Sequence, residues 1–246
     1  PVCLQGLRNF EDEGRIRVIR HDEKFNYARI NNIAARHARG DLLVLLNNDT
    51  EALRPDWLKR MAGLALQDGV GAVGPKLLYE DRTVQHAGVV LGMNGGAVHE
   101  LVGLGADDPG YQGLASATRE VGAVTAACLA IRRRAFEAVG GLNEDFEVAF
   151  NDVVLCCDLL VAGYRNVYLA EALFLHLESK TRGANTTSEK LEREQDECRR
   201  AIALHPRLFA ADPYYSANLS LDVFFKPAFP PRRTRGGNAT ARASSA

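Results

Sequence analysis

The sequence predicts an α/β domain in which a mainly parallel sheet carries helices on both faces. Short apolar runs typical of buried strands alternate along the chain with segments whose apolar residues recur at helical spacing. With 246 residues, of which 46% are hydrophobic, the chain can form one large domain with its own core. Ligands of such sheets bind beyond the carboxyl ends of the strands, so a functional site is expected there.

The first half of the chain supplies most of this alternation. Unbroken apolar runs such as Leu42–Leu46 indicate strands, whereas apolar side chains three or four residues apart, as at Tyr27, Ile30 and Ala34, indicate helices. Gly40 is a typical helix terminator. The expected elements are a helix at 1–14, a strand at 16–20, a helix at 26–39, a strand at 42–46, a helix from about residue 55, and strands at 71–79 and 86–92.

The second half continues the pattern and then changes in character. Strands are expected at 121–133, 166–170 and 173–177, and helices at 134–139, 153–161 and 186–205. Residues 92–113 are rich in Gly and Asp and predict a long, mobile loop. The last helix is polar and predicted to be exposed, and Thr186 and Glu189 have the spacing of a capping box. From Lys226 onward the chain holds five basic residues and no acid, so we expect a domain at 1–222 and a disordered basic tail at 223–246.

The composition limits the classes of function. A formal net charge of -1 gives no electrostatic footprint for nucleic acid. No apolar run approaches the roughly 18–20 residues that cross a bilayer, and no signal peptide is recognised. The five cysteines are odd in number and form no CxxC pair, which indicates reduced, buried thiols rather than a zinc site. We therefore expect a cytoplasmic globular protein that binds no nucleic acid.

A polar cluster, Asn47-Asn48-Asp49, follows the apolar run Leu42–Leu46. A strand buried on both faces holds only apolar residues, so polar groups occur where it emerges, at the edge where ligands bind. Asp49 is a suitable oxygen ligand for Mg²⁺ or Mn²⁺ bound through substrate phosphates, and the adjacent amides suit a ribose hydroxyl. A residue of this cluster can equally serve as the N-cap of the following helix. The spacing alone supports both interpretations.

Asp152 and His176 each allow two interpretations. Asp152 begins the apolar segment Val153–Val161, where the helix dipole stabilises a carboxylate, and capping is the more common outcome at such a position. Its apolar neighbours also suit a general base. His176 interrupts an apolar strand, where a histidine is more often a satisfied core residue than a metal ligand.

Other polar residues have ordinary structural interpretations. Gln85 and His86 lie near the start of an expected strand and are interpreted as surface groups. The basic run Arg132–Arg134 is interpreted as a solvated helix start, although binding of a phosphate stays open.

Five segments, taken in their order, resemble consecutive blocks of the family 2 glycosyltransferases. They are FNYARINNIAARHARGDLLVLLNNDTE, VGAVGPKLLYEDRTVQHAGVVLG, ACLAIRRRAFEAVGGLNEDF, FNDVVLCCDLLVAGYRNVYLAEALFLHLES and DPYYSANLSLD. The resemblance extends from Ile16 to Asp222 and is strongest to the bacterial rhamnosyltransferase-like members and those of O-antigen or polysaccharide synthesis. It implies a GT-A fold, with a mainly parallel, Rossmann-like sheet.

The resemblance also implies a reaction and a set of site residues. The enzyme would transfer a sugar from a nucleotide-diphosphate donor to a hydroxyl acceptor, with inversion at the anomeric carbon. Asn47-Asn48-Asp49 matches the family's DxD motif, with Asn47 in place of the first Asp, so Asp49 would hold Mn²⁺ or Mg²⁺ and the two amides would contact substrate. His176 matches a histidine that completes the metal site in several members. Asn151-Asp152 matches an ED-type motif, in which Asp152 would be the catalytic base and Asn151 a substrate contact.

The implied partners are a nucleotide-diphosphate sugar and a glycan or lipid-linked glycan acceptor, in the synthesis of cell-surface polysaccharide or O-antigen. Such an acceptor would bring the protein to the inner face of the membrane as a peripheral partner. The basic tail could contribute to that contact.

The sequence departs from the family pattern in two places. Ala126 stands where relatives often have Gly, which would crowd the acceptor side. The family's first strands, which bind the nucleotide base, are not recognised, so the resemblance implies that the chain begins some 40–50 residues inside the domain. A non-catalytic module that binds sugar or nucleotide is therefore the alternative function, against which the retained Asp49, Asp152 and His176 argue. A nucleotidyltransferase would need a Gly-rich phosphate loop, which is not found.

Overall fold

The computed structural model describes residues 2–177 and 188–232. Its helices are α1 (Val2–Asp12), α2 (Tyr27–His37), α3 (Trp57–Ala65), α4 (Arg133–Ala138), α5 (Asn151–Val161), α6 (Ser188–Leu204) and α7 (Pro206–Ala210), with 3₁₀ turns η1 (Met93–Gly95) and η2 (Tyr111–Gly113). Its strands are β1 (Leu42–Leu46), β2 (Thr50–Ala52), β3 (Val70–Leu78), β4 (Val84–His86), β5 (Val89–Leu91), β6 (Ala97–His99), β7 (Arg119–Val121), β8 (Cys128–Arg132) and β9 (Arg165–His176).

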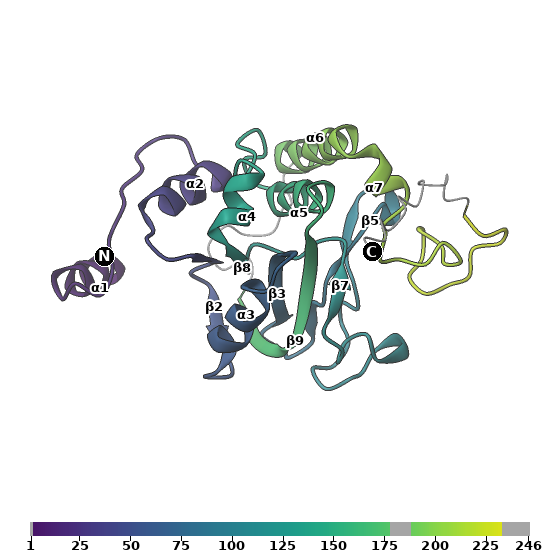
Figure 1. Ribbon diagram of the computed structural model, residues 1–246, viewed down its shortest axis with the longest axis horizontal. Helices are drawn as coiled ribbons and strands as arrows, with labels where there is room; N and C mark the ends of the chain where they lie inside the picture. Colours follow the sequence, from purple (N-terminus) through teal and green to yellow (C-terminus); the bar gives the residue numbers. More distant parts are fainter. Residues whose placement is uncertain (1, 178–187, 233–246) are drawn as a thin grey trace, which may run out of the picture.

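The central strands lie between two layers of helices (Figure 1), and alternate residues of these strands belong to different cores. In β3, Ala72 belongs to the core on the side of α2, α4 and α5, whereas Val73 belongs to the core on the side of α3. Ile131 and Ala130 of β8 divide between the two cores in the same way. A period of two is what a strand buried on both faces shows. The prediction that helices cover both faces of the sheet is confirmed.

The pairing of the strands differs from the predicted mainly parallel sheet. Strands β1 and β3 both pair antiparallel with β8, which lies between them, and β3 pairs parallel with β9. Thus β1, β3 and β9 run in one direction, as the alternation predicted, but β3–β9 is the only parallel pair among the described strands. The cause is the late strand β8, which inserts between β1 and β3. Alternation along a chain indicates the crossovers, not which later strand fills a gap between two earlier ones.

Several predicted elements are divided or joined. The predicted strand 86–92 is split into β4 and β5 by a turn at Gly88, whose φ is 103°. The predicted loop 92–113 contains β6, which pairs antiparallel with β5, as well as both 3₁₀ turns. The predicted strand 121–133 divides into β7 and β8, separated by residues 122–127. The two expected strands 166–170 and 173–177 are one long strand, β9.

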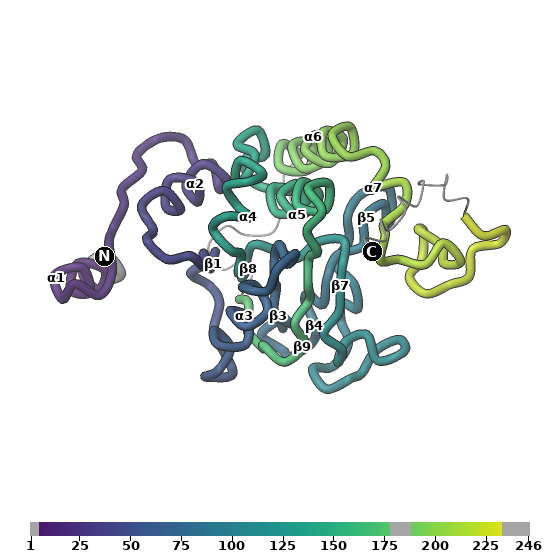
Figure 2. The backbone as a smooth tube through the Cα atoms, viewed as in Figure 1, coloured from purple at the N-terminus to yellow at the C-terminus, as the bar shows by residue number. Residues whose placement is uncertain are grey.

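The amino-terminal segment lies at one end of the molecule (Figure 2). Helix α1 is joined to the domain by a segment that includes residues 16–20, which were predicted to be a strand. The segment pairs with no described strand, and Val18 N instead donates to Glu11 Oε1 at 2.8 Å. An apolar pattern gives a strand only when a neighbour supplies the pairing, so this prediction was wrong.

The packed structure continues past residue 222. Phe224 and Phe225 pack around Tyr215, and Phe225 also stacks on Tyr111 with ring centroids 4.4 Å apart. Arg232 Nε donates to Leu219 O at 2.8 Å. Part of the segment predicted as a tail therefore packs on the domain through Phe224, Phe225 and Arg232, whereas Phe229 is 99% exposed. Residues 233–246 lie outside the described residues, as does Thr186 of the expected capping box.

No helix within the two described ranges combines the length and the apolar character that crossing a bilayer requires. The longest of them, α6, has 17 residues and is strongly polar.

Candidate functional site

The polar cluster after β1 is held between the ends of two other strands. Asn47 N donates to Ala127 O at 2.9 Å, just before β8, and Leu177 N donates to Asp49 O at 2.8 Å, just after β9. Thr50 closes the turn, because its Oγ1 donates to Asn47 O at 2.7 Å. The chain then pairs as β2 with β9, with Thr50 opposite His176. The cluster is thus fixed by backbone bonds and starts a short strand rather than capping α3.

Asp49 and His176 are brought together. The Nε2 atom of His176 lies 3.3 Å from Asp49 Oδ1, and the two side chains are 12% and 20% exposed. On the other side of the ring, His176 Nδ1 lies 2.7 Å from Gln85 Oε1. An amide oxygen only accepts hydrogen bonds, so Nδ1 carries the proton that lies between them. In the neutral imidazole, Nε2 then presents a lone pair toward the carboxylate.

A lone pair facing a carboxylate is an unfavourable contact unless a positive charge lies nearby. Asp49 Oδ1 is buried and has no hydrogen-bond donor. Either protonation of the imidazole or a cation bound by both groups would satisfy the pair. The donor set, one carboxylate and one imidazole, fits a divalent cation that takes its remaining ligands from substrate phosphates and water. Among residues 2–177 and 188–232, no group of three or more His, Cys, Asp or Glu side chains is arranged to hold a metal.

Gln85 and His86 are buried, contrary to their interpretation as surface groups. Gln85 is 4% exposed, and its Nε2 also donates to His176 O at 3.5 Å. His86 Nδ1 lies 3.2 Å from His99 Nδ1. Burial, more than the nearby charges of His99 and Arg119, lowers the pKa of His86 well below its usual value. Sequence reasoning missed Gln85 because a single polar residue beside a strand gives no sign of which face it occupies.

Asp152 lies in the first turn of α5, and both of its carboxylate oxygens accept backbone hydrogen bonds. Oδ1 accepts from Val153 N at 2.8 Å, and Oδ2 accepts from Ala126 N at 3.0 Å. The second bond ties the carboxylate to the segment 122–127, between β7 and β8. A carboxylate has about four lone-pair sites, so two accepted bonds leave it able to accept a proton or another hydrogen bond.

The two sides of the site meet at consecutive residues of that segment. Ala126 N donates to Asp152, whereas Ala127 O accepts from Asn47 N. Tyr27 of α2 adds a third tie, because its hydroxyl donates to Ala126 O at 2.8 Å. Ala126, expected to crowd the acceptor side, is buried and linked by its backbone to α2 and α5.

The three asparagines predicted to contact substrate differ in their surroundings. Asn48 is exposed, and Asn47 is half-buried beside Asp49. Asn151 is 4% exposed, and its amide donates to Val148 O at 3.1 Å, so this side chain helps to shape the loop before α5. A direct contact between Asn151 and substrate stays a prediction.

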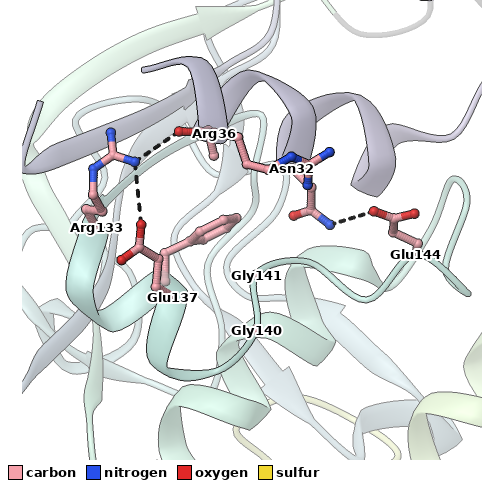
Figure 3. Close-up of a pocket in the computed structure, with 9 residues that line it drawn as sticks. Asn32, Arg36, Arg133, Glu137, Gly140, Gly141 and Glu144 are labelled. Carbon is pink, nitrogen blue, oxygen red and sulfur yellow. Dashed lines mark hydrogen bonds and ion pairs between the residues drawn. The ribbon is translucent and has the colours of Figure 1, made fainter. Parts of the chain in front are cut away.

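Each arginine of the basic run Arg132–Arg134 forms an ion pair within the chain. Arg132 and Arg134 both pair with Asp68, and Arg133 pairs with Glu137 at 3.6 Å. Arg133 lines a cavity of about 300 Å³ between α2 and α4, shown in Figure 3, in which Asn32 also contacts Glu144. No residue of the predicted site lines this cavity, and within it Arg133 already pairs with Glu137. We therefore do not assign it to the phosphates of a substrate.

Comparison with known proteins identifies a family and several relatives of this chain. The model of the family described as glycosyl transferase family 2 matches residues 3–140. An uncharacterized protein of Sinorhizobium fredii, y4gI, is 44% identical over 212 residues, which is 85% of this chain and 23% of the relative. The O-antigen biosynthesis protein RfbC of Myxococcus xanthus is 42% identical over 203 residues, which is 81% of this chain and 16% of RfbC. The chain thus spans less than a quarter of the length of these relatives.

Solved structures share the fold at low sequence identity. GalNAc-T7, solved with UDP, GalNAc and Mn²⁺, superposes with a TM-score of 0.62 at 12% identity, covering 84% of this chain and 40% of that one. The mannosyltransferase PcManGT of Pyrobaculum calidifontis, solved with GDP-Man and Mn²⁺, gives 0.52 at 16% identity, covering 84% and 50%. TarS of S. aureus, residues 1–349 with UDP-GlcNAc, gives 0.54 at 12% identity, covering 85% and 58%.

Proposed function

Because the chain belongs to glycosyl transferase family 2 and has the GT-A fold, we propose that it transfers a sugar from a nucleotide-diphosphate donor to a hydroxyl group of a glycan. The proposed reaction inverts the anomeric carbon and serves the synthesis of cell-surface polysaccharide. The similarity to an O-antigen biosynthesis protein supports this setting.

The observation that carries the proposal is the pair formed by Asp49 and His176. Its buried, donor-free Oδ1 beside an imidazole nitrogen suits a divalent cation, Mn²⁺ or Mg²⁺. When bound, such a cation offsets the negative charge that develops on a departing diphosphate. Fold neighbours solved with Mn²⁺ and a nucleotide or nucleotide sugar support this type of ligand.

Asp152 is the proposed catalytic base. A sugar hydroxyl is a poor nucleophile, so its proton must be removed as the oxygen attacks. The acceptor oxygen forms a bond to the anomeric carbon, the bond from that carbon to the donor phosphate oxygen breaks, and its electron pair leaves with the nucleoside diphosphate. The acceptor proton moves to a carboxylate oxygen of Asp152. Attack opposite to the leaving group inverts the configuration.

The acceptor is proposed to be a glycan or a lipid-linked glycan at the inner face of the membrane. Asn47 and Asn48 are proposed to contact the donor, because they adjoin Asp49 in the turn that follows β1. Asn151 is proposed to contact substrate, and its amide also shapes the loop before α5.

The test uses the intact protein and measures sugar transfer together with donor binding. Asp152→Asn should remove turnover and leave donor binding in Mn²⁺ unchanged, since the amide cannot accept the proton. Asp49→Ala should weaken donor binding in Mn²⁺ and remove its sensitivity to EDTA. Donor binding without any turnover in the wild-type protein would favour the non-catalytic module instead. Equal binding and turnover in EDTA would contradict the metal role.

A further inference from the structure

A glutamate in the last part of the chain is buried on backbone donors. Glu197 of α6 is 1% exposed, although the helix was predicted to be polar and exposed. Its Oε1 accepts from Glu147 N at 2.9 Å and from Val148 N at 3.3 Å, and its Oε2 accepts from Ala149 N at 2.7 Å. Three successive N–H groups form a concave, positively polarised surface that compensates a buried carboxylate.

The same helix contacts this loop at a second point. Arg200 lies one turn further along α6, and its Nη1 donates to Asp145 O at 2.8 Å. Its guanidinium also lies over the ring of Phe146, 5.0 Å from the centroid. From the opposite side, Tyr27 N of α2 donates to Glu147 O at 2.8 Å. The loop 145–149 is therefore held between α2 and α6.

The loop leads directly into the residue proposed as the base. Phe150 has a φ of 58°, a conformation that non-glycine residues adopt rarely and keep only when their surroundings impose it. Helix α5 begins at the next residue, and Asp152 follows in its first turn. The backbone bonds to Glu197 end one residue before Phe150. They therefore hold the backbone up to the residue that precedes Phe150.

We propose that Glu197 is a positioning residue for Asp152: by holding the N–H groups of residues 147–149, it fixes the loop from which the carboxylate is presented. This inference rests on the proposed role of Asp152 as the base. It predicts that a change at Glu197 affects the chemical step more than donor binding, because Asp49 and His176 are held by β1, β2 and β9 instead.

The experiment compares Glu197→Gln and Glu197→Asp with Glu192→Gln, an exposed glutamate of the same helix. Gln retains the size of the side chain but faces an N–H donor with an NH₂ group, and Asp keeps the charge but is one methylene too short. In the intact protein, kcat should fall on the order of 10–100-fold for Glu197→Gln and less for Glu197→Asp, with the KM for donor unchanged. Hydrogen exchange of the amides of residues 147–149 should accelerate in both variants and not in Glu192→Gln.

Three results would overturn the inference. One is faster exchange at 147–149 with an unchanged kcat, while Asp152→Asn is inactive, which would make Glu197 purely structural. Another is a parallel loss of donor binding, which would indicate general damage to the fold. Turnover by Asp152→Asn would instead refute the proposed base, and the inference with it. If Glu197→Gln does not accumulate as folded protein, the same comparison is decided by Glu197→Asp.

Discussion

The contact between Gln85 and His176 offers a sharp test of the proposed metal site. Because Gln85 Oε1 lies 2.7 Å from His176 Nδ1, it holds the proton on that nitrogen and leaves the lone pair of Nε2 toward Asp49. Gln85→Leu removes the acceptor with little change in volume. The imidazole can then adopt the other tautomer, with its proton on Nε2, and donate a hydrogen bond to Asp49. The electron pair of Nε2 is then no longer available to a cation.

The magnitude follows from the burial of this contact. Leaving a buried donor without an acceptor costs about 1–3 kcal/mol, and loss of such an orienting partner typically weakens metal binding by roughly 10–100-fold. At about 1.4 kcal/mol per factor of ten, these two expectations agree. Gln85→Glu provides a stronger acceptor for the same proton, so it should bind Mn²⁺ at least as tightly as the wild type.

The assay is a calorimetric titration of the intact protein with Mn²⁺ in the presence of a nucleoside diphosphate, which measures the affinity for Mn²⁺. Gln67→Leu is the matched control, because Gln67 is exposed and its side chain donates to the nearby Gly63 O. Equal Mn²⁺ affinity of Gln85→Leu, Gln67→Leu and wild type, together with a loss in His176→Ala, would refute the orienting role.

Three further predictions concern stability and reactivity. His86 is held neutral by burial, so unfolding takes up a proton once the pH is below about 6.5, and stability should fall toward acid by up to about 1.4 kcal/mol per pH unit for this group. Urea denaturation at several pH values should show a shallower decline for His86→Gln, and equal slopes would contradict this origin. Burial raises the pKa of Cys128 to about 12 and also raises those of Cys156 and Cys157, so a thiol reagent at neutral pH should modify the half-buried Cys198 before these three thiols, as peptide mapping would show. Gly92→Ala would place a Cβ against Phe209 O at a φ of 83°, and should destabilise the protein by at least about 2 kcal/mol. Gly95→Ala, with a φ of 74° and open space around its Cβ, should cost about 1 kcal/mol in the same denaturation assay, and similar losses in both variants would show that the contact does not matter.

The sequence was most informative where a pattern has one physical explanation. The run Leu42–Leu46 followed by Asn47-Asn48-Asp49 predicted a strand that ends in a polar turn, and β1 with its turn has that form. The predicted burial on both faces was wrong, because only Leu43 and Leu45 are buried and Leu46 is 49% exposed. The helical spacings that predicted α2, α3 and α5 were also confirmed. Periodicity records burial, and burial is what decides these elements.

Contacts between residues far apart in the sequence could not be predicted from these local patterns. The insertion of β8 between β1 and β3 depends on pairing energies that no local window contains. The burial of Gln85 and Glu197 depends on partners 91 and about 50 residues away, so their polar side chains read as surface. The prediction of a strand at residues 16–20 was wrong for the same reason, since a strand forms only where another strand pairs with it.

The link at Ala126 and Ala127 has a consequence for genetics. Its contacts with Asp152 and Asn47 use the main-chain N–H of one residue and the carbonyl of the next, so exchanging either side chain leaves both bonds available. Because both residues are already alanine, an alanine scan would pass over this position, whereas a charge placed at either buried residue would be costly. Insertion or deletion of a single residue in 122–127 would shift one anchor relative to the other, and proline at 126 would remove the N–H outright. We therefore expect the number of residues in this segment to matter more for the site than the identity of a small apolar side chain within it.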